Sequence, residues 1–352
     1  MQNINYKLIE VARNSRKMSQ RELSLKLPKL NQQNLSKVER GEIPVSEESI
    51  KNIAKALDFP VDFFCQQEIK TPLSNIYFRK RATLPTKELD KIFADVKIIL
   101  QAIDHLLEFI ELKEYPKFCF DINEGWTTDS IASRLREIMQ IHPDKPVENV
   151  ITKIEELGVI VVLYNSSHDK FDGLTAYTDR GVPVIFVNSN MSNERKKFTV
   201  IHELSHLVTH IPCNIEPWRN YENEANSITS AFYLPEKYVS RDLLNLNYYK
   251  LGEIKTYWGV SKSMIIRRAK DLNIISPETY TYLNIELGRR GERLKEEGYV
   301  HLDKPQIIET IIDLLKNEGF TLEKLAKETR LSINDYVRLF DKSNSVVKLR
   351  VI

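Results

Sequence analysis

Residues 202–206 have the pattern H-E-x-x-H, whose residue types and spacing point more directly to chemistry than any other part of the chain. Positions i and i+4 of a helix lie on one face, so the imidazoles of His202 and His206 can reach the same metal ion. Glu203 would then lie beside the open coordination position, where a water molecule would be the nucleophile and the carboxylate its base. The pattern is typical of metallopeptidases. The alternative is a helix with two histidines that share no ligand.

The sequence around the motif favours a buried helix. Apolar residues recur through positions 198–211, and histidines in a buried helix need partners for their ring nitrogens, which a metal would supply. A second helical segment follows from Tyr221 to Leu234. Of its two glutamates, we expect Glu224 rather than Glu222 to complete a His₂Glu set.

Strands are predicted upstream of the motif, at residues 159–164, 173–178 and 182–188. The last two would form a hairpin through the turn at 179–181. A strand beside the metal could hold an extended peptide by β-addition.

From Asp172 to Pro235 the chain resembles the ImmA/IrrE metallopeptidases. The resemblance rests on Asp172-Gly173, the strand at 183–188, the run 195–199 before the motif, His210 after it, and the segment 224–226 leading to residues 234–235. It implies Zn²⁺ bound by His202, His206 and Glu224, with Glu203 as general base. Members of this family cut particular cytoplasmic regulatory proteins.

Two further groups near the motif are candidate ligands. His210 continues the i, i+4 series, but it lies about 80° round the helix from His202 and one turn too far along, so a structural or substrate-side role is favoured. The three cysteines, at 65, 119 and 213, do not form a disulfide framework and are expected to be reduced. Whether Cys119 or Cys213 fills the fourth position on the zinc stays open.

The amino-terminal residues 3–64 have the pattern of a helix-turn-helix. Ser19 is predicted to cap one helix, with Glu22 completing a capping box, and Asn31 to cap the next, which Gly41 ends. Glu39 is expected to pair with an arginine of the first helix such as Arg13.

This segment resembles the Xre-type, lambda-repressor-like DNA-binding domains in positions 19–20, 35–36 and 39–41. The resemblance implies that the second helix reads double-stranded DNA, and the polar side chains of that helix suit base edges. The expected DNA contacts are Gln20, Gln32, Gln33, Asn34 and Lys37. A protein-docking or dimerising role is the alternative, and the sequence leaves homodimer formation open.

Composition bounds the class of protein. With 352 residues, 42% hydrophobic and 28% charged, the chain can bury a sizeable core, and a net charge of +2 indicates no particular partner. No apolar run is long enough to span a membrane, so a cytoplasmic location is expected.

The predicted fold class is mainly α with a small β-sheet. It comprises an α+β, zincin-like peptidase core, an all-α helix-turn-helix domain and a helical C-terminal region. The predicted divisions are residues 1–69 for the helix-turn-helix, 70–120 for a linker with a long amphipathic helix, 121–245 for the peptidase core, 246–300 for a helical, winged or helix-turn-helix-like extension, and 301–352 for a C-terminal helical domain.

Two functions fit these observations. The first is a zinc endopeptidase that regulates transcription by cleaving a repressor at a specific site. The second is a DNA-binding regulator whose peptidase fold acts as a sensor or dimerisation module, in a phage-related or toxin–antitoxin setting. The protein substrate, its cleavage site, the activating signal, the operator and the ligand of the C-terminal helices are not encoded in any recognisable pattern.

Overall fold

The structure is a computed structural model that describes residues 4–67, 84–166, 168–213, 218–293 and 295–340. It is mainly helical with one small sheet, as the sequence predicts. The part of the predicted linker between residues 70 and 83 lies outside the described residues. No described helix is long and apolar enough to cross a membrane.

The amino-terminal helices pack around a small apolar core. They are α1 (Lys7–Ser15), α2 (Gln20–Ser24), α3 (Gln32–Glu39) and α4 (Glu47–Leu57), followed by a 3₁₀ turn at Val61–Cys65. Ser19 and Glu22 form the predicted capping box, and the Asn31 side chain caps α3 by accepting from the Asn34 amide. Inside this core, Arg13 makes a two-point ion pair with Glu39, at 2.7 and 3.0 Å, which confirms the predicted pairing.

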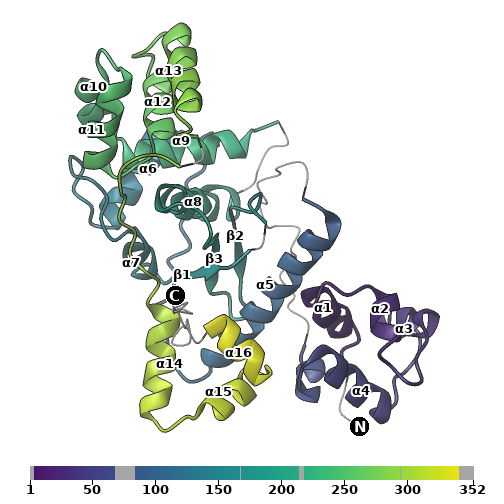
Figure 1. Cartoon of the computed structure of the whole chain (residues 1–352). Helices are drawn as coiled ribbons and strands as arrows, with labels where there is room; N and C mark the ends of the chain where they lie inside the picture. Colours follow the sequence, from purple (N-terminus) through teal and green to yellow (C-terminus); the bar gives the residue numbers. More distant parts are fainter. Residues whose placement is uncertain (1–3, 68–83, 167, 214–217, 294, 341–352) are drawn as a thin grey trace, which may run out of the picture.

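Helix α5 (Thr86–Leu106) lies between the helix-turn-helix and the sheet (Figure 1). It packs on α1, and its buried Asp95 accepts a hydrogen bond of 2.7 Å from the Tyr164 hydroxyl at the end of the first strand. The helix ends at Leu106, inside the predicted linker of residues 70–120. The chain beyond it runs without regular structure, and the amide of Phe120 donates to the carbonyl of Val208 in the motif segment.

Three strands form the sheet: β1 (Ile160–Tyr164), β2 (Gly173–Tyr177) and β3 (Pro183–Asn188), in the order β1-β3-β2. β1 runs parallel to β3, and β2 pairs antiparallel to β3 as the predicted hairpin. Alternate residues of the strands face two different cores. Leu174 and Phe186 join the core that contains α5, whereas Ile185 and Val187 join the core that contains the motif helix.

The remaining helices cover this motif-side core or follow it in the chain. They are α6 (Thr128–Ile138), α7 (Val150–Glu155), α8 (Asn193–Ser205), α9 (Tyr221–Tyr233), α10 (Glu236–Leu243), α11 (Tyr248–Trp258), α12 (Lys262–Asp271), α13 (Pro277–Arg289), α14 (Ile307–Asn317), α15 (Leu322–Glu328) and α16 (Ile333–Phe340). The pair α11–α12 lies in the predicted extension at residues 246–300, and the pair α15–α16 lies in the predicted C-terminal helical domain.

The last three helices lie beside α5 and β1 (Figure 1). Asp335 in α16 is buried and pairs with Arg16, whose guanidinium also lies 4.5 Å over the ring of Phe59. The carboxy-terminal helices therefore contact the helix-turn-helix directly as well as the sheet.

Candidate metal centre and DNA-contacting helix

Helix α8 carries His202 and Glu203, ends at Ser205 directly before His206, and packs on β2 and β3. Val200, Ile201 and Leu204 are fully buried, which fixes the rotation of the helix about its axis. His202, Glu203 and His206 are consequently no more than 2% exposed. The Nε2 atoms of the two histidines face each other at 3.1 Å, as the i, i+4 spacing predicts.

Glu222, near the start of α9, brings a carboxylate to the same point. Its oxygens lie 3.4 Å from Nε2 of His202 and 3.4 Å from Nε2 of His206. One donor atom from each of the three residues lies within 4.8 Å of the other two. Two imidazoles and a carboxylate therefore converge on one buried position, which is the donor set of a His₂Glu zinc site.

The protonation states of these side chains suit a cation. Burial lowers the pKa of His206 to about 4, so the ring is neutral at pH 7 and keeps a lone pair. Burial by itself would raise the pKa of Glu222, but its contacts with His202 and His206 hold it well below the usual range, so the carboxylate is charged. Both Glu222 oxygens are buried and accept no hydrogen bond from the described residues. A metal would satisfy these atoms, and the residues present fit one.

The structure differs from the sequence prediction at the third ligand. Glu224 does not join the two histidines of the motif. It accepts a hydrogen bond of 3.0 Å from His210 Nε2 and two from Arg219, at 3.1 and 2.7 Å. Residues 222 and 224 are about 200° apart around a helix, so only one of them can face α8. The rotation of α9, set by its buried residues Ala225 and Ile228, selects Glu222.

Glu203 is held from the neighbouring strand. The Thr175 hydroxyl on β2 donates to Glu203 Oε2 at 2.9 Å. Gly173, two residues earlier on the same face, allows the close approach. A Cβ there would lie 2.6 Å from Thr199 Cγ2 and 2.7 Å from the Phe186 carbonyl oxygen. The sequence offered no signal for the contact between Thr175 and Glu203.

His210 lies behind the metal position. The chain forms a π-helical turn over His206–His210, in which the Ile211 amide donates to the His206 carbonyl. In this widened turn His210 Nδ1 lies 2.8 Å from His206 Nδ1. His210 therefore contacts a proposed ligand and not the metal position, in line with the structural role that its spacing favours. Turns of this kind are frequent at functional sites.

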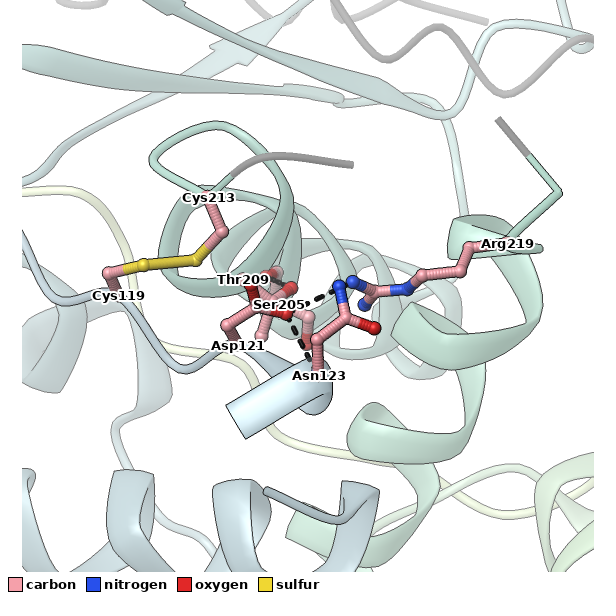
Figure 2. The surroundings of a disulfide bond; sticks show 7 residues. All are labelled: Cys119, Asp121, Asn123, Ser205, Thr209, Cys213 and Arg219. Atoms are coloured by element: carbon pink, nitrogen blue, oxygen red, sulfur yellow. Dashed lines mark hydrogen bonds and ion pairs between the residues drawn. A yellow bond between two sulfur atoms is a disulfide. The ribbon is translucent and has the colours of Figure 1, made fainter. Parts of the chain in front are cut away.

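The expectation of three reduced cysteines is corrected by the structure. Cys119 and Cys213 form a disulfide across 94 residues with a Cα–Cα distance of 6.0 Å, and Cys65 is free (Figure 2). The paired sulfurs are not part of the metal-binding group, so neither is an available thiolate ligand. Two cysteines this far apart in the chain carry no local signal of their pairing.

A cavity of about 650 Å³ is lined by neighbours of the candidate centre, although His202, Glu203, His206 and Glu222 do not line it. Its lining includes Phe198, whose ring stacks on His202 with centroids 5.8 Å apart, and Asn226, one turn along α9 from Glu222. Arg195 from α8 and Arg267 from α12 add charge to its wall. The cavity is large enough for one or more residues of a peptide. Residues 173–176 of β2, the edge strand, are buried, so this strand does not present an open edge to a peptide here. Pairing of a peptide with β2 stays a prediction.

The expected DNA-contacting side chains, which lie on α3 and at the start of α2, differ in their exposure to solvent. Gln32, Gln33, Asn34 and Lys37 are exposed to solvent. Gln20, at the start of α2, is half-buried and donates to Glu39 Oε2 at 2.7 Å, so it also braces α2 against α3.

The region around α8 and the amino-terminal helices each match a known protein family. Residues 155–270 match the family model described as the IrrE N-terminal-like domain, a span that includes the sheet, α8 and α9. Residues 9–64 match the model described as Helix-turn-helix. No curated protein was found to match the chain.

Proposed function

We propose that this chain, in which an IrrE N-terminal-like domain follows an amino-terminal helix-turn-helix domain, is a zinc-dependent endopeptidase that cleaves a transcriptional regulator. The observation that carries the proposal is the convergence of His202, His206 and Glu222 on one buried position, with Glu203 next to His202 in the chain.

The chemistry assigns a role to each of these groups. When bound by His202, His206 and Glu222, a zinc ion supplies Lewis acidity that polarises the scissile carbonyl and makes water more acidic. Glu203 accepts the proton of the attacking water and returns it to the leaving amine. Thr175, through its hydrogen bond to Oε2, holds the Glu203 carboxylate in one orientation.

The cavity beside the centre supports a protein substrate. Its lining combines an apolar surface at Phe198 and Met264 with charged groups of both signs, such as Arg195 and Glu194. Arg195 pairs with Asp172 and Glu194 pairs with Lys255, so this mixed lining offers a peptide polar contacts as well as an apolar surface.

The helix-turn-helix supplies the second part of the proposal, which is that the peptidase acts at DNA. The exposed side chains of α3 present amide groups, which suit base edges, and a lysine, which suits phosphate. The domain would bring the peptidase to a DNA-bound regulator.

The test compares new protein amino termini in cells that carry the wild type with those in cells that carry Glu203→Gln, with and without DNA damage. One regulatory protein should gain a new terminus only with the wild type. Glu203→Gln should still bind zinc, whereas His202→Ala should lose both zinc and cleavage. Full proteolysis by Glu203→Gln would falsify the mechanism.

The exposed face of α3 also supports the second function, a DNA-binding regulator whose peptidase fold is a sensor or dimerisation module. The two functions differ in the effect of Glu203→Gln on regulation. A regulator that does not depend on cleavage keeps normal operator occupancy and normal control of its target gene when the general base is lost.

A further inference from the structure

The second ring nitrogen of His206 faces another histidine. Nε2 of His206 points to His202 and Glu222, while Nδ1 lies 2.8 Å from Nδ1 of His210. Both rings are no more than 1% exposed. The two nitrogens can approach this closely only when one carries a proton and the other a lone pair.

The groups beyond His210 determine which nitrogen carries that proton. Nε2 of His210 lies 3.0 Å from Glu224 Oε2, and the carboxylate is already charge-paired with Arg219. An ionised carboxylate can only accept, so Nε2 of His210 must donate to it. The His210 ring is 1% exposed and shares the Glu224 carboxylate with the Arg219 guanidinium, so a second ring proton would be a buried charge close to another cation. A neutral His210 that donates from Nε2 accepts at Nδ1.

We propose that His210 is a positioning residue for the metal centre: it accepts a hydrogen bond from His206 Nδ1, donates one to Glu224, and thereby keeps the lone pair of His206 Nε2 directed at the metal position. The inference rests on the proposed function for the identity of the metal, and it extends that function to residues behind the centre. A ligand histidine held through its other nitrogen is fixed in orientation and becomes more basic.

The structure holds the far end of this chain of contacts in place. Arg219 donates to Asp121 at 3.1 Å as well as to Glu224, and Asp121 lies two residues from Cys119 (Figure 2). The same short segment is attached once to the π-helical turn and once to the chain just after it. The Phe120 amide donates to the Val208 carbonyl at 2.8 Å, and Cys119 is bonded to Cys213. His210 and its two charged neighbours are therefore braced from one side by residues 119–121.

His202 provides an internal comparison. Its Nδ1 is buried and has no hydrogen-bond partner among the described residues. The hydrogen bond to His210 therefore acts on only one of the two proposed histidine ligands. That ligand is His206, whose tautomer is determined by its surroundings.

The first test reads the tautomer directly in metal-free protein. ¹⁵N correlation spectra of the labelled wild type should show His206 protonated at Nδ1, a state that does not depend on zinc. A proton on Nε2 of His206 would overturn the proposal. If the wild type binds no zinc, the proposed function fails, but this measurement still decides the role of His210.

The second test compares His210→Asn with His210→Leu. The two side chains have nearly the same shape, but only asparagine offers an oxygen where Nδ1 of the histidine stands. Zinc affinity, measured by competition with a chromophoric chelator, should fall about 10–100-fold for leucine and only a few-fold for asparagine. Circular dichroism of both metal-free variants controls for folding. Equal affinities for the two folded variants would contradict the proposal.

Discussion

Thr175 donates a hydrogen bond of 2.9 Å to the carboxylate of Glu203, which ties the edge strand of the sheet to α8, the helix of Glu203 and His202. Thr175 is 2% exposed, so the bond is shielded from water. A shielded hydrogen bond to a charged group contributes about 1.5–3 kcal/mol. Glu203, the proposed general base, is therefore oriented by β2 and not by α8 alone.

Replacing Thr175 by valine should slow cleavage about tenfold or more without loss of zinc, because valine keeps the shape of threonine but cannot donate. The measurement is the cleavage rate of the identified substrate together with the zinc content of the purified protein. Thr175→Ser, which retains the hydroxyl, should stay close to the wild type. An unchanged rate for the valine variant would show that Glu203 needs no support from β2.

Replacing Gly173 by alanine should lower the free energy of unfolding by about 1–3 kcal/mol, because the new Cβ would overlap Thr199 and the backbone of β3. Urea denaturation of the metal-free protein measures this change. Gly252→Ala in α11 is the matched control. A Cβ there meets nothing within 4 Å, and alanine should stabilise that helix by about 0.5–1 kcal/mol. A neutral effect at Gly173 would indicate that α8 and β2 can move apart freely.

Glu222→Gln and Glu224→Gln should separate the two carboxylates. Loss of the Glu222 charge removes a proposed ligand, so zinc affinity should fall by more than the roughly 10–100-fold cost of a change outside the ligand set. Glu224→Gln retains an oxygen that can accept from His210, and this variant should still bind one zinc ion per chain. Zinc content after gel filtration distinguishes them. The reverse result would restore Glu224 as the ligand.

Thiol counting should find one reactive cysteine in the unfolded, unreduced protein and three after reduction, since Cys119 is paired with Cys213 and Cys65 is free. Reduction should also lower the free energy of unfolding by about 2–4 kcal/mol, because the bond closes a long loop. Cys65→Ser should leave this difference unchanged. Three reactive thiols before reduction would show that Cys119 and Cys213 are not bonded. Residues 119–121 would then lack one of their attachments to the chain near His210.

Gln33→Ala and Lys37→Ala should weaken binding to DNA fragments enriched from the genome by the wild type. A lost base contact costs about 1–3 kcal/mol and relaxes sequence preference, whereas a lost phosphate contact weakens all sequences alike. Lys51→Ala on α4, where the lysine pairs with Glu47 on the surface, is the control with the same loss of charge. If all three variants bind like the wild type, α3 is not the recognition helix.

Local sequence determined the features that depend on neighbouring residues. The i, i+4 spacing placed His202 and His206 on one face, and the capping signals at Ser19 and Asn31 set the starts of α2 and α3. The sequence also located the three strands, at residues 159–164, 173–178 and 182–188, and a turn of three residues was enough to predict the hairpin of β2 and β3. These properties follow from helix and strand geometry over a few residues, so they can be derived without the fold.

Only the tertiary structure decided which distant groups meet. Whether Glu222 or Glu224 faces the histidines depends on the rotation of α9 against α8, and that rotation is set by packing across the whole core. The pairing of Cys119 with Cys213, the contact of Thr175 with Glu203, and the π-helical turn that brings His210 against His206 have the same origin. In each case the partners are chosen by how rigid elements pack, and the spacing of residues along the chain does not contain that information.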